Sequence, residues 1–119
     1  MSIYKGDKLV AGGSADTAIK DMPIKNGFAT YTQNISPRTQ ITIPVVFKMP
    51  MPNTDYAILT GNSIHGTVWG DQLITISGKT VNGFDIIIYN VNANTAHKPD
   101  ITPGNESGVY WHVEPFKNN

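Results

Sequence analysis

Residues 108–119 read GVYWHVEPFKNN, and this closing stretch is the part of the chain that most clearly decides the fold. Its apolar and polar side chains alternate, which is the two-residue period of a β-strand with one buried face. One face holds Trp111 between two valines, and the other face holds Tyr110 and His112. A strand of this kind needs a sheet to complete, so the rest of the chain should also be β.

Trp111 is the largest side chain on the apolar face of this predicted strand. Aromatic side chains from the inner faces of two sheets pack together across the core of a sandwich. We therefore expect Trp111 to contact Phe47 and Phe84, which lie on the apolar faces of two earlier segments.

The remaining segments with strand character are short, alternating and separated by turn residues. The strands are predicted over residues 27–35, 39–49, 56–64, 73–76, 84–91 and 109–113. The helical candidate at residues 14–20 lasts under two turns. The sequence therefore predicts an all-β fold, a small antiparallel β-sandwich of about six strands with an extended N-terminal arm.

Local turn chemistry refines this prediction. Pro44 has no backbone N–H to donate, so its strand is predicted to lie at a sheet edge or to bulge there. Residues 53–55 (Asn-Thr-Asp) predict a turn. The segment 72–91 predicts a hairpin whose turn lies either at Gly78 or at Asn82-Gly83.

Length, charge and composition limit the classes of function. The chain has 119 residues, a formal net charge of zero and no cysteine. It is long enough for one core, and nothing in its charge points to nucleic acid. No apolar run is long enough to insert into a membrane as a helix, and no secretory signal is visible. We expect synthesis in a cytoplasm.

Residues 1–26 differ from the rest and are predicted to form an arm or attachment segment ahead of a sandwich domain at residues 27–119. The arm is small and polar, with apolar pairs that have no core of their own nearby. These pairs are Ile3, Tyr4, Leu9 and Val10. We expect them to dock onto a partner or to add a strand to its sheet edge; the alternative is a disordered tail.

The long connection at residues 61–71, GNSIHGTVWGD, holds the most interesting candidate site. A tryptophan ring can stack on a sugar while neighbouring amide, hydroxyl and carboxylate groups bind its hydroxyls. The candidate ligand-binding residues are Asn62, Ser63, His65, Trp69 and Asp71. The alternative is that Trp69 begins a strand and packs inward. The second long loop, residues 92–107, is a further candidate for display.

The sequence offers only weak candidates for catalytic and metal sites. Ser63, His65 and Asp71 could be drawn as a triad, but the Gly-x-Ser-x-Gly turn of a nucleophile elbow is absent. His65 and His97 could converge on a metal, although solvated loop histidines are the more ordinary interpretation. We therefore expect no catalytic residues, no metal and no cofactor.

The order of the strong segments carries a resemblance. The run NGFATYTQNISPRTQITIPVVFKMPMPNTDYAIL is followed by ITISGKTVNGFDIIIYN and then by GVYWHVEPF. This arrangement resembles the C-terminal tip domain of bacteriophage tail-fibre and receptor-binding proteins, and also the six-stranded sandwich of H-type lectins. The likeness covers roughly residues 27–116 and consists of a pattern of positions. Tip domains of that family usually end a long fibre, whereas a short arm precedes the domain here.

The resemblance implies a virion structural protein, assembled in the host cytoplasm, that displays a homotrimeric sandwich for adhesion to a host surface polysaccharide or protein. The arm would attach it to other virion proteins. In such a trimer Tyr110 and His112 would line a subunit contact; in a monomer they would face solvent. The alternatives are a decoration or assembly protein without a host ligand, and a stand-alone lectin-like carbohydrate-binding module.

Overall fold

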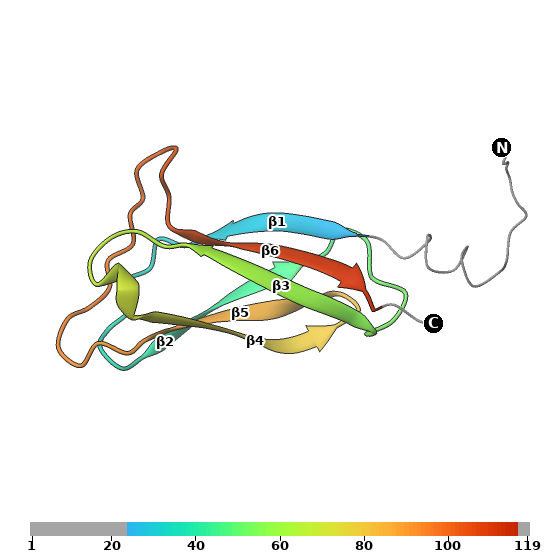
Figure 1. Ribbon diagram of the computed structural model, residues 1–119, viewed down its shortest axis with the longest axis horizontal. Helices are drawn as coiled ribbons and strands as arrows, with labels where there is room; N and C mark the ends of the chain where they lie inside the picture. Colours follow the sequence, from blue (N-terminus) through green and yellow to red (C-terminus); the bar gives the residue numbers. More distant parts are fainter. Residues whose placement is uncertain (1–23, 117–119) are drawn as a thin grey trace, which may run out of the picture.

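The structure, a computed structural model, describes residues 24–116 and consists of two packed three-stranded sheets (Figure 1). The elements are β1 (Lys25–Thr30), β2 (Gln40–Val46), β3 (Tyr56–Ser63), the short 3₁₀ helix η1 (Trp69–Asp71), β4 (Gln72–Thr80), β5 (Gly83–Asn90) and β6 (Gly108–Pro115). The predicted all-β sandwich of six strands is confirmed. The arm residues Ile3, Tyr4, Leu9 and Val10 and the helical candidate at residues 14–20 lie outside the described residues.

The last strand occupies the centre of its sheet. The strand orders are β1-β6-β3 in one sheet and β2-β5-β4 in the other, and every neighbouring pair is antiparallel. Trp111 of β6 lies opposite Gly27 of β1 on one side and Thr60 of β3 on the other. Strand β6 therefore pairs with two strands that do not pair with each other. This central position accounts for the strong strand pattern of the closing stretch.

The core forms between the inner faces of the two sheets. The Trp111 ring lies 6.0 Å from the ring of Phe47 and 5.7 Å from that of Phe84, centroid to centroid, so the predicted aromatic cluster is confirmed. These distances fall in the range of favourable aromatic pairs. Ile86 and Ile88 of β5 and Val109 and Val113 of β6 are fully buried around it.

Gly27 makes room for the indole. A Cβ atom at this position would lie 2.6 Å from Cζ2 of Trp111. Real Cβ atoms do not approach other atoms so closely, and packed interiors resist even a single added methyl group. The absence of a side chain in β1 therefore lets the Trp111 ring lie over the neighbouring strand.

The turn chemistry of the sequence is reproduced in detail. Pro44 lies in β2, which is an edge strand of its sheet as described. The β4–β5 hairpin turns at Val81 and Asn82, immediately before Gly83 with its φ of 146°. Gly78, the other predicted turn position, lies instead within an irregularity of pairing between Ser77 and Thr80.

The first predicted strand is too long. We expected it over residues 27–35, but β1 runs from Lys25 to Thr30. Tyr31 and Ile35 leave the sheet and are buried at its end, where Ile35 forms a bridge with His97. Alternation continues past Thr30 in the sequence, but the buried partners of Tyr31 and Ile35 belong to a loop and not to a strand. Within residues 24–116 no helix is long and apolar enough to cross a membrane.

The packing of Trp111 over Gly27 predicts a sharp contrast between two strand glycines. Gly27→Ala should lower the free energy of unfolding by about 1–3 kcal/mol, because the new methyl group displaces the indole. Gly61→Ala is the matched control, since nothing lies within 4 Å of a Cβ there. It should be neutral or stabilising by up to about 1 kcal/mol. Urea unfolding of the two variants measures the difference; equal stabilities would contradict the packing.

Candidate functional site

The two long loops lie side by side at one end of the sandwich, away from the strand end where the described chain begins (Figure 1). Gly66 forms a β-bridge with Pro99, and the backbone N–H of Asp100 donates to the carbonyl of His65 at 3.1 Å. Loops so far apart in the sequence are rarely joined by backbone hydrogen bonds unless the end of the domain is ordered. We call this end of the molecule the loop end.

A buried histidine holds the loop end in place by hydrogen bonds. His97 is fully buried, and its Nδ1 lies 2.7 Å from the carbonyl oxygen of Thr67. A carbonyl can only accept, so Nδ1 carries the hydrogen and Nε2 is left as an acceptor. The hydroxyl of Tyr31, 2.7 Å from Nε2, therefore donates to it. This chain of hydrogen bonds connects the end of β1 to both loops.

Asn90 provides a second anchor. Its Nδ2 donates to the carbonyls of Ile35 and Thr95, each at 3.0 Å, and its Oδ1 accepts from the backbone N–H of Asn92 at 3.0 Å. The side chain is fully buried. Buried amides are stable when all their polar atoms have partners, so this residue fixes three backbone segments at once.

Trp69 projects from the loop end into solvent. It begins η1, and 64% of its surface is exposed, so it does not pack inward. The preceding residue, Val68, has a φ of 45°, which is strained for a β-branched side chain. The carbonyl of Val68 accepts from Nε2 of Gln72 at 3.0 Å and from the N–H of Asp71 at 2.9 Å. These bonds hold the strained turn that presents the indole.

The indole borders a hollow of about 520 Å³, which we call the Trp69 hollow. Oγ of Ser63 and Nε2 of His65 lie 3.2 Å apart in its wall. The full lining is Asn62, Ser63, Ile64, His65, Gly66 and Trp69. Four of the five predicted ligand-binding residues thus line one hollow, three of them beside the Trp69 ring.

Asp71, the fifth predicted residue, does not line the hollow. Its carboxylate accepts from Nδ2 of Asn92 at 2.8 Å and so ties η1 to the second loop. The triad considered from the sequence is therefore not assembled around Ser63 and His65. Both nitrogens of His97 are engaged as described above. Within residues 24–116 no three His, Asp or Glu side chains gather as a metal site would require.

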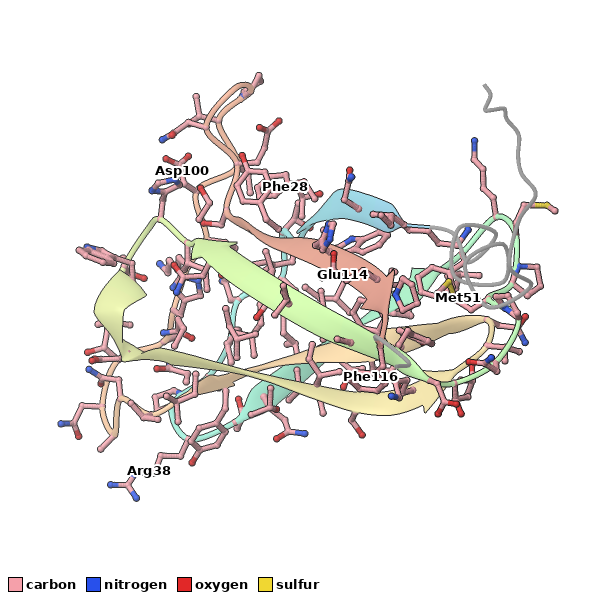
Figure 2. The ribbon with its side chains drawn as sticks, turned by 45° about the vertical axis from the view of Figure 1, so that its right-hand side comes forward. Phe28, Arg38, Met51, Asp100, Glu114 and Phe116 are labelled. Atoms are coloured by element: carbon pink, nitrogen blue, oxygen red, sulfur yellow. The ribbon has the colours of Figure 1, made fainter. Side chains whose placement is uncertain are left out.

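Asp100 adds negative charge at the loop end (Figure 2). Its carboxylate accepts from the backbone N–H of Thr102 at 2.9 Å and from Nδ2 of Asn105 at 3.0 Å. The hydrogen bonds from Thr102, with a smaller contribution from Asn105 and from the charge of His65, lower the pKa of Asp100 below its usual range. The carboxylate therefore stays ionised at the loop end, whose two loops also contain Asp71, Lys98 and Glu106.

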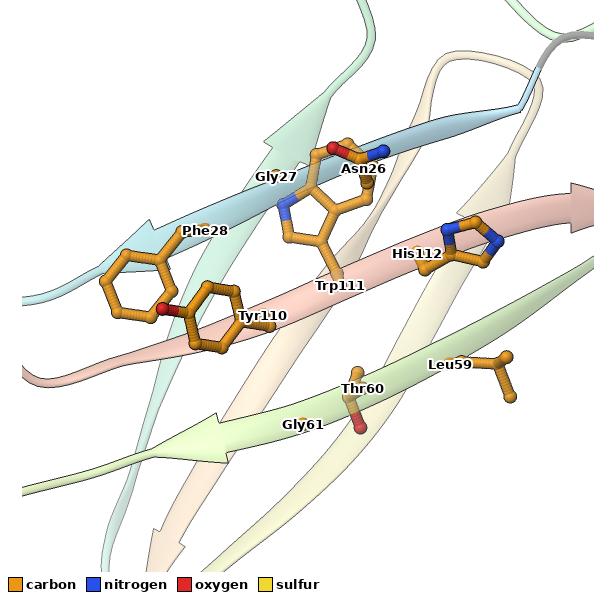
Figure 3. Close-up of a pocket in the computed structure, with 9 residues that line it drawn as sticks. All are labelled: Asn26, Gly27, Phe28, Leu59, Thr60, Gly61, Tyr110, Trp111 and His112. Atoms are coloured by element: carbon orange, nitrogen blue, oxygen red, sulfur yellow. The ribbon is translucent and has the colours of Figure 1, made fainter.

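A second hollow, of about 600 Å³, lies on the outer face of the β1-β6-β3 sheet (Figure 3). We call it the sheet-face hollow. Both predicted interface residues, Tyr110 and His112, line it, and Nε2 of His112 lies 3.0 Å from Oε2 of Glu114. Sequence reasoning missed Phe28 and Leu59, which border the same hollow. Alternation placed Phe28 and Leu59 on strand faces, but only the register shows that they flank β6.

The two hollows differ in chemistry: the Trp69 hollow has amide, hydroxyl and imidazole groups beside one aromatic ring, whereas the sheet-face hollow is more apolar and has several exposed apolar side chains. Searches with the sequence against protein-family models and curated proteins, and with the structure against solved structures, found no match. The function must therefore be argued from these two sites and from the residues that hold them.

The burial of the Tyr31 hydroxyl predicts a pH-dependent contribution to stability. Burial, only partly offset by the hydroxyl of Ser107, raises the pKa of Tyr31 from 10.0 to about 12. The folded protein therefore holds Tyr31 neutral where the unfolded chain ionises it. Stability from this group is intact below pH 10 and falls by roughly 2–3 kcal/mol as the pH rises to 12.

Tyr31→Phe tests this assignment. At pH 8 the variant should be about 1–3 kcal/mol less stable, because Nε2 of His97 loses its donor. The difference from wild type should shrink between pH 10 and 12, as followed by urea unfolding at each pH. Tyr110→Phe, which removes an exposed hydroxyl, should unfold like wild type at pH 8. A stability difference for Tyr31→Phe that stays constant up to pH 12 would show that the hydroxyl is not held neutral.

Proposed function

We propose that this protein is an adhesion module of the bacteriophage fibre-tip kind, which binds a host surface polysaccharide or protein through its loop end. One observation carries the proposal: Trp69 is 64% exposed on a strained, hydrogen-bonded turn beside Asn62, Ser63 and His65. A strained backbone that holds a large apolar side chain in solvent is rare in folded proteins unless that side chain binds a partner.

The chemistry of the Trp69 hollow suits a saccharide. The indole offers an apolar face on which a sugar ring can stack, and the amide, hydroxyl and imidazole groups offer both donors and acceptors for sugar hydroxyls. Because the turn is already fixed by the bonds from Gln72 and Asp71 to the Val68 carbonyl, binding would not have to order it. Adhesion of this kind is binding without chemical transformation of the ligand.

A single shallow site of this size binds weakly, so the function requires several copies. We propose a homotrimer on the virion, attached through the arm, with one loop end per subunit directed outward. Linked weak sites gain avidity without new contacts. The support for the virion setting is the resemblance of residues 27–116 to fibre-tip domains together with the six-stranded sandwich that this resemblance implied.

The sheet-face hollow favours a second candidate function. An apolar face of this kind suits contact with another protein, which is what a virion decoration or assembly subunit would need. The two candidate functions require different sites: adhesion requires the Trp69 hollow, whereas a role in assembly alone does not.

Trp69→Ala separates these candidates. On an array of purified bacterial surface polysaccharides, the wild-type chain should bind at least one, and the variant should bind it at least about tenfold more weakly, because a stacking contact is worth about 1.5 kcal/mol. Leu73→Ala is the matched control, since it removes another exposed apolar side chain, 56% exposed, from the opposite sheet.

The stability of both variants should stay within about 0.5 kcal/mol of wild type, since the substituted side chains are exposed. Glycan binding that is unchanged by Trp69→Ala would remove the Trp69 hollow as the ligand site. Binding to none of the polysaccharides, with virion association retained, would favour the assembly role.

A further inference from the structure

The outer face of the β1-β6-β3 sheet combines a projection with a recess. The rings of Phe28 and Tyr110 pack against each other, with centroids 4.3 Å apart, and Tyr110 is 57% exposed. Beside them the sheet-face hollow opens over Gly61, where nothing lies within 4 Å of a Cβ position (Figure 3). A knob and a hollow thus lie next to each other on three adjacent strands.

The knob is fixed in place by the backbone beneath it. A Cβ at Gly108 would lie 2.5 Å from Cζ of Phe28, so the ring rests directly on β6. The hollow is equally well defined, since Gly61 lies opposite Tyr110 in the register of β3 and β6 and leaves a gap in the row of side chains. Neither feature needs to rearrange to receive a partner of matching shape.

The charged groups on this face limit the kinds of partner that can bind it. Among the residues that line the hollow, His112 alone can carry a positive charge, and its Nε2 contacts the carboxylate of Glu114. A strongly anionic ligand would find no lysine or arginine among these lining residues. The whole chain has a formal net charge of zero, so no net charge repulsion opposes the association of two copies.

We propose that the sheet-face hollow is filled by the Phe28–Tyr110 pair of a second copy of this chain. Projection and recess on one face are what self-association requires, because each copy then offers a knob and accepts one. Leu59, 57% exposed at the rim, would be covered in the same contact. The inference names a contact for the homo-oligomer of the proposed function, and it does not depend on ligand binding at the loop end, since association can be measured without any ligand.

The test is the mass of the full chain by light scattering and sedimentation from about 10 μM to about 1 mM. We expect a mass above 13.0 kDa that rises with concentration. Gly61→Leu fills the hollow without backbone strain, and Leu59→Ser removes apolar surface from its rim. Each should weaken association at least tenfold. Leu73→Ser is the matched control on the other sheet, 56% exposed in wild type, and should associate like the unmodified chain.

Circular dichroism of each variant confirms that the sandwich is intact, and Leu59→Ser keeps the test decisive if Gly61→Leu does not fold. A wild-type chain that remains at 13.0 kDa up to about 1 mM would overturn the proposal, as would association that survives both substitutions. Loss of polysaccharide binding in Leu59→Ser, with no self-association in wild type, would mean that this face binds a glycan instead. A dimer built through this face would uphold the contact and contradict only the proposed trimer.

Discussion

The structure depends on one indole ring and on the missing side chain that admits it. Trp111 packs between Phe47 and Phe84 and extends over β1 at Gly27, where a Cβ would lie 2.6 Å from the ring. The strand that carries it is the last in the chain and the central one in its sheet. Among the described strands β1 and β3 each pair only with β6, so the strand that completes this sheet also brings the indole into the aromatic core.

The loop end rests on this core through buried polar groups. Tyr31, His97 and Asn90 connect the end of β1, both long loops and the end of β5 by hydrogen bonds whose partners are mostly backbone carbonyls. Such a network stabilises only when every member is satisfied, and it then specifies one arrangement. A polar network of this kind explains how a loop can keep a strained residue at Val68 and an exposed Trp69 in a fixed place.

Much of the fold followed from the sequence, because alternation and turn residues act locally. The inward face of β6, the aromatic partners of Trp111 and the edge position of Pro44 were all predicted. The hydrogen bond between Tyr31 and His97 was not predicted, because the two residues lie 66 positions apart and local sequence patterns do not indicate such contacts. Likewise, a carboxylate near Trp69 in sequence pointed to a shared site, yet Asp71 turns towards Asn92 in the other loop.

We propose separate uses for two surfaces of the molecule: the Trp69 hollow at its loop end and the more apolar hollow on its sheet face. The most direct test of this division is an NMR titration of the full chain with a polysaccharide fragment identified by array binding. The chain has two tryptophans and so two indole N–H signals. We predict that the signal of Trp69 shifts on saturation while that of Trp111 stays in place. A shift confined to Trp111, a residue of the strand that lines the sheet-face hollow, would contradict adhesion through the loop end.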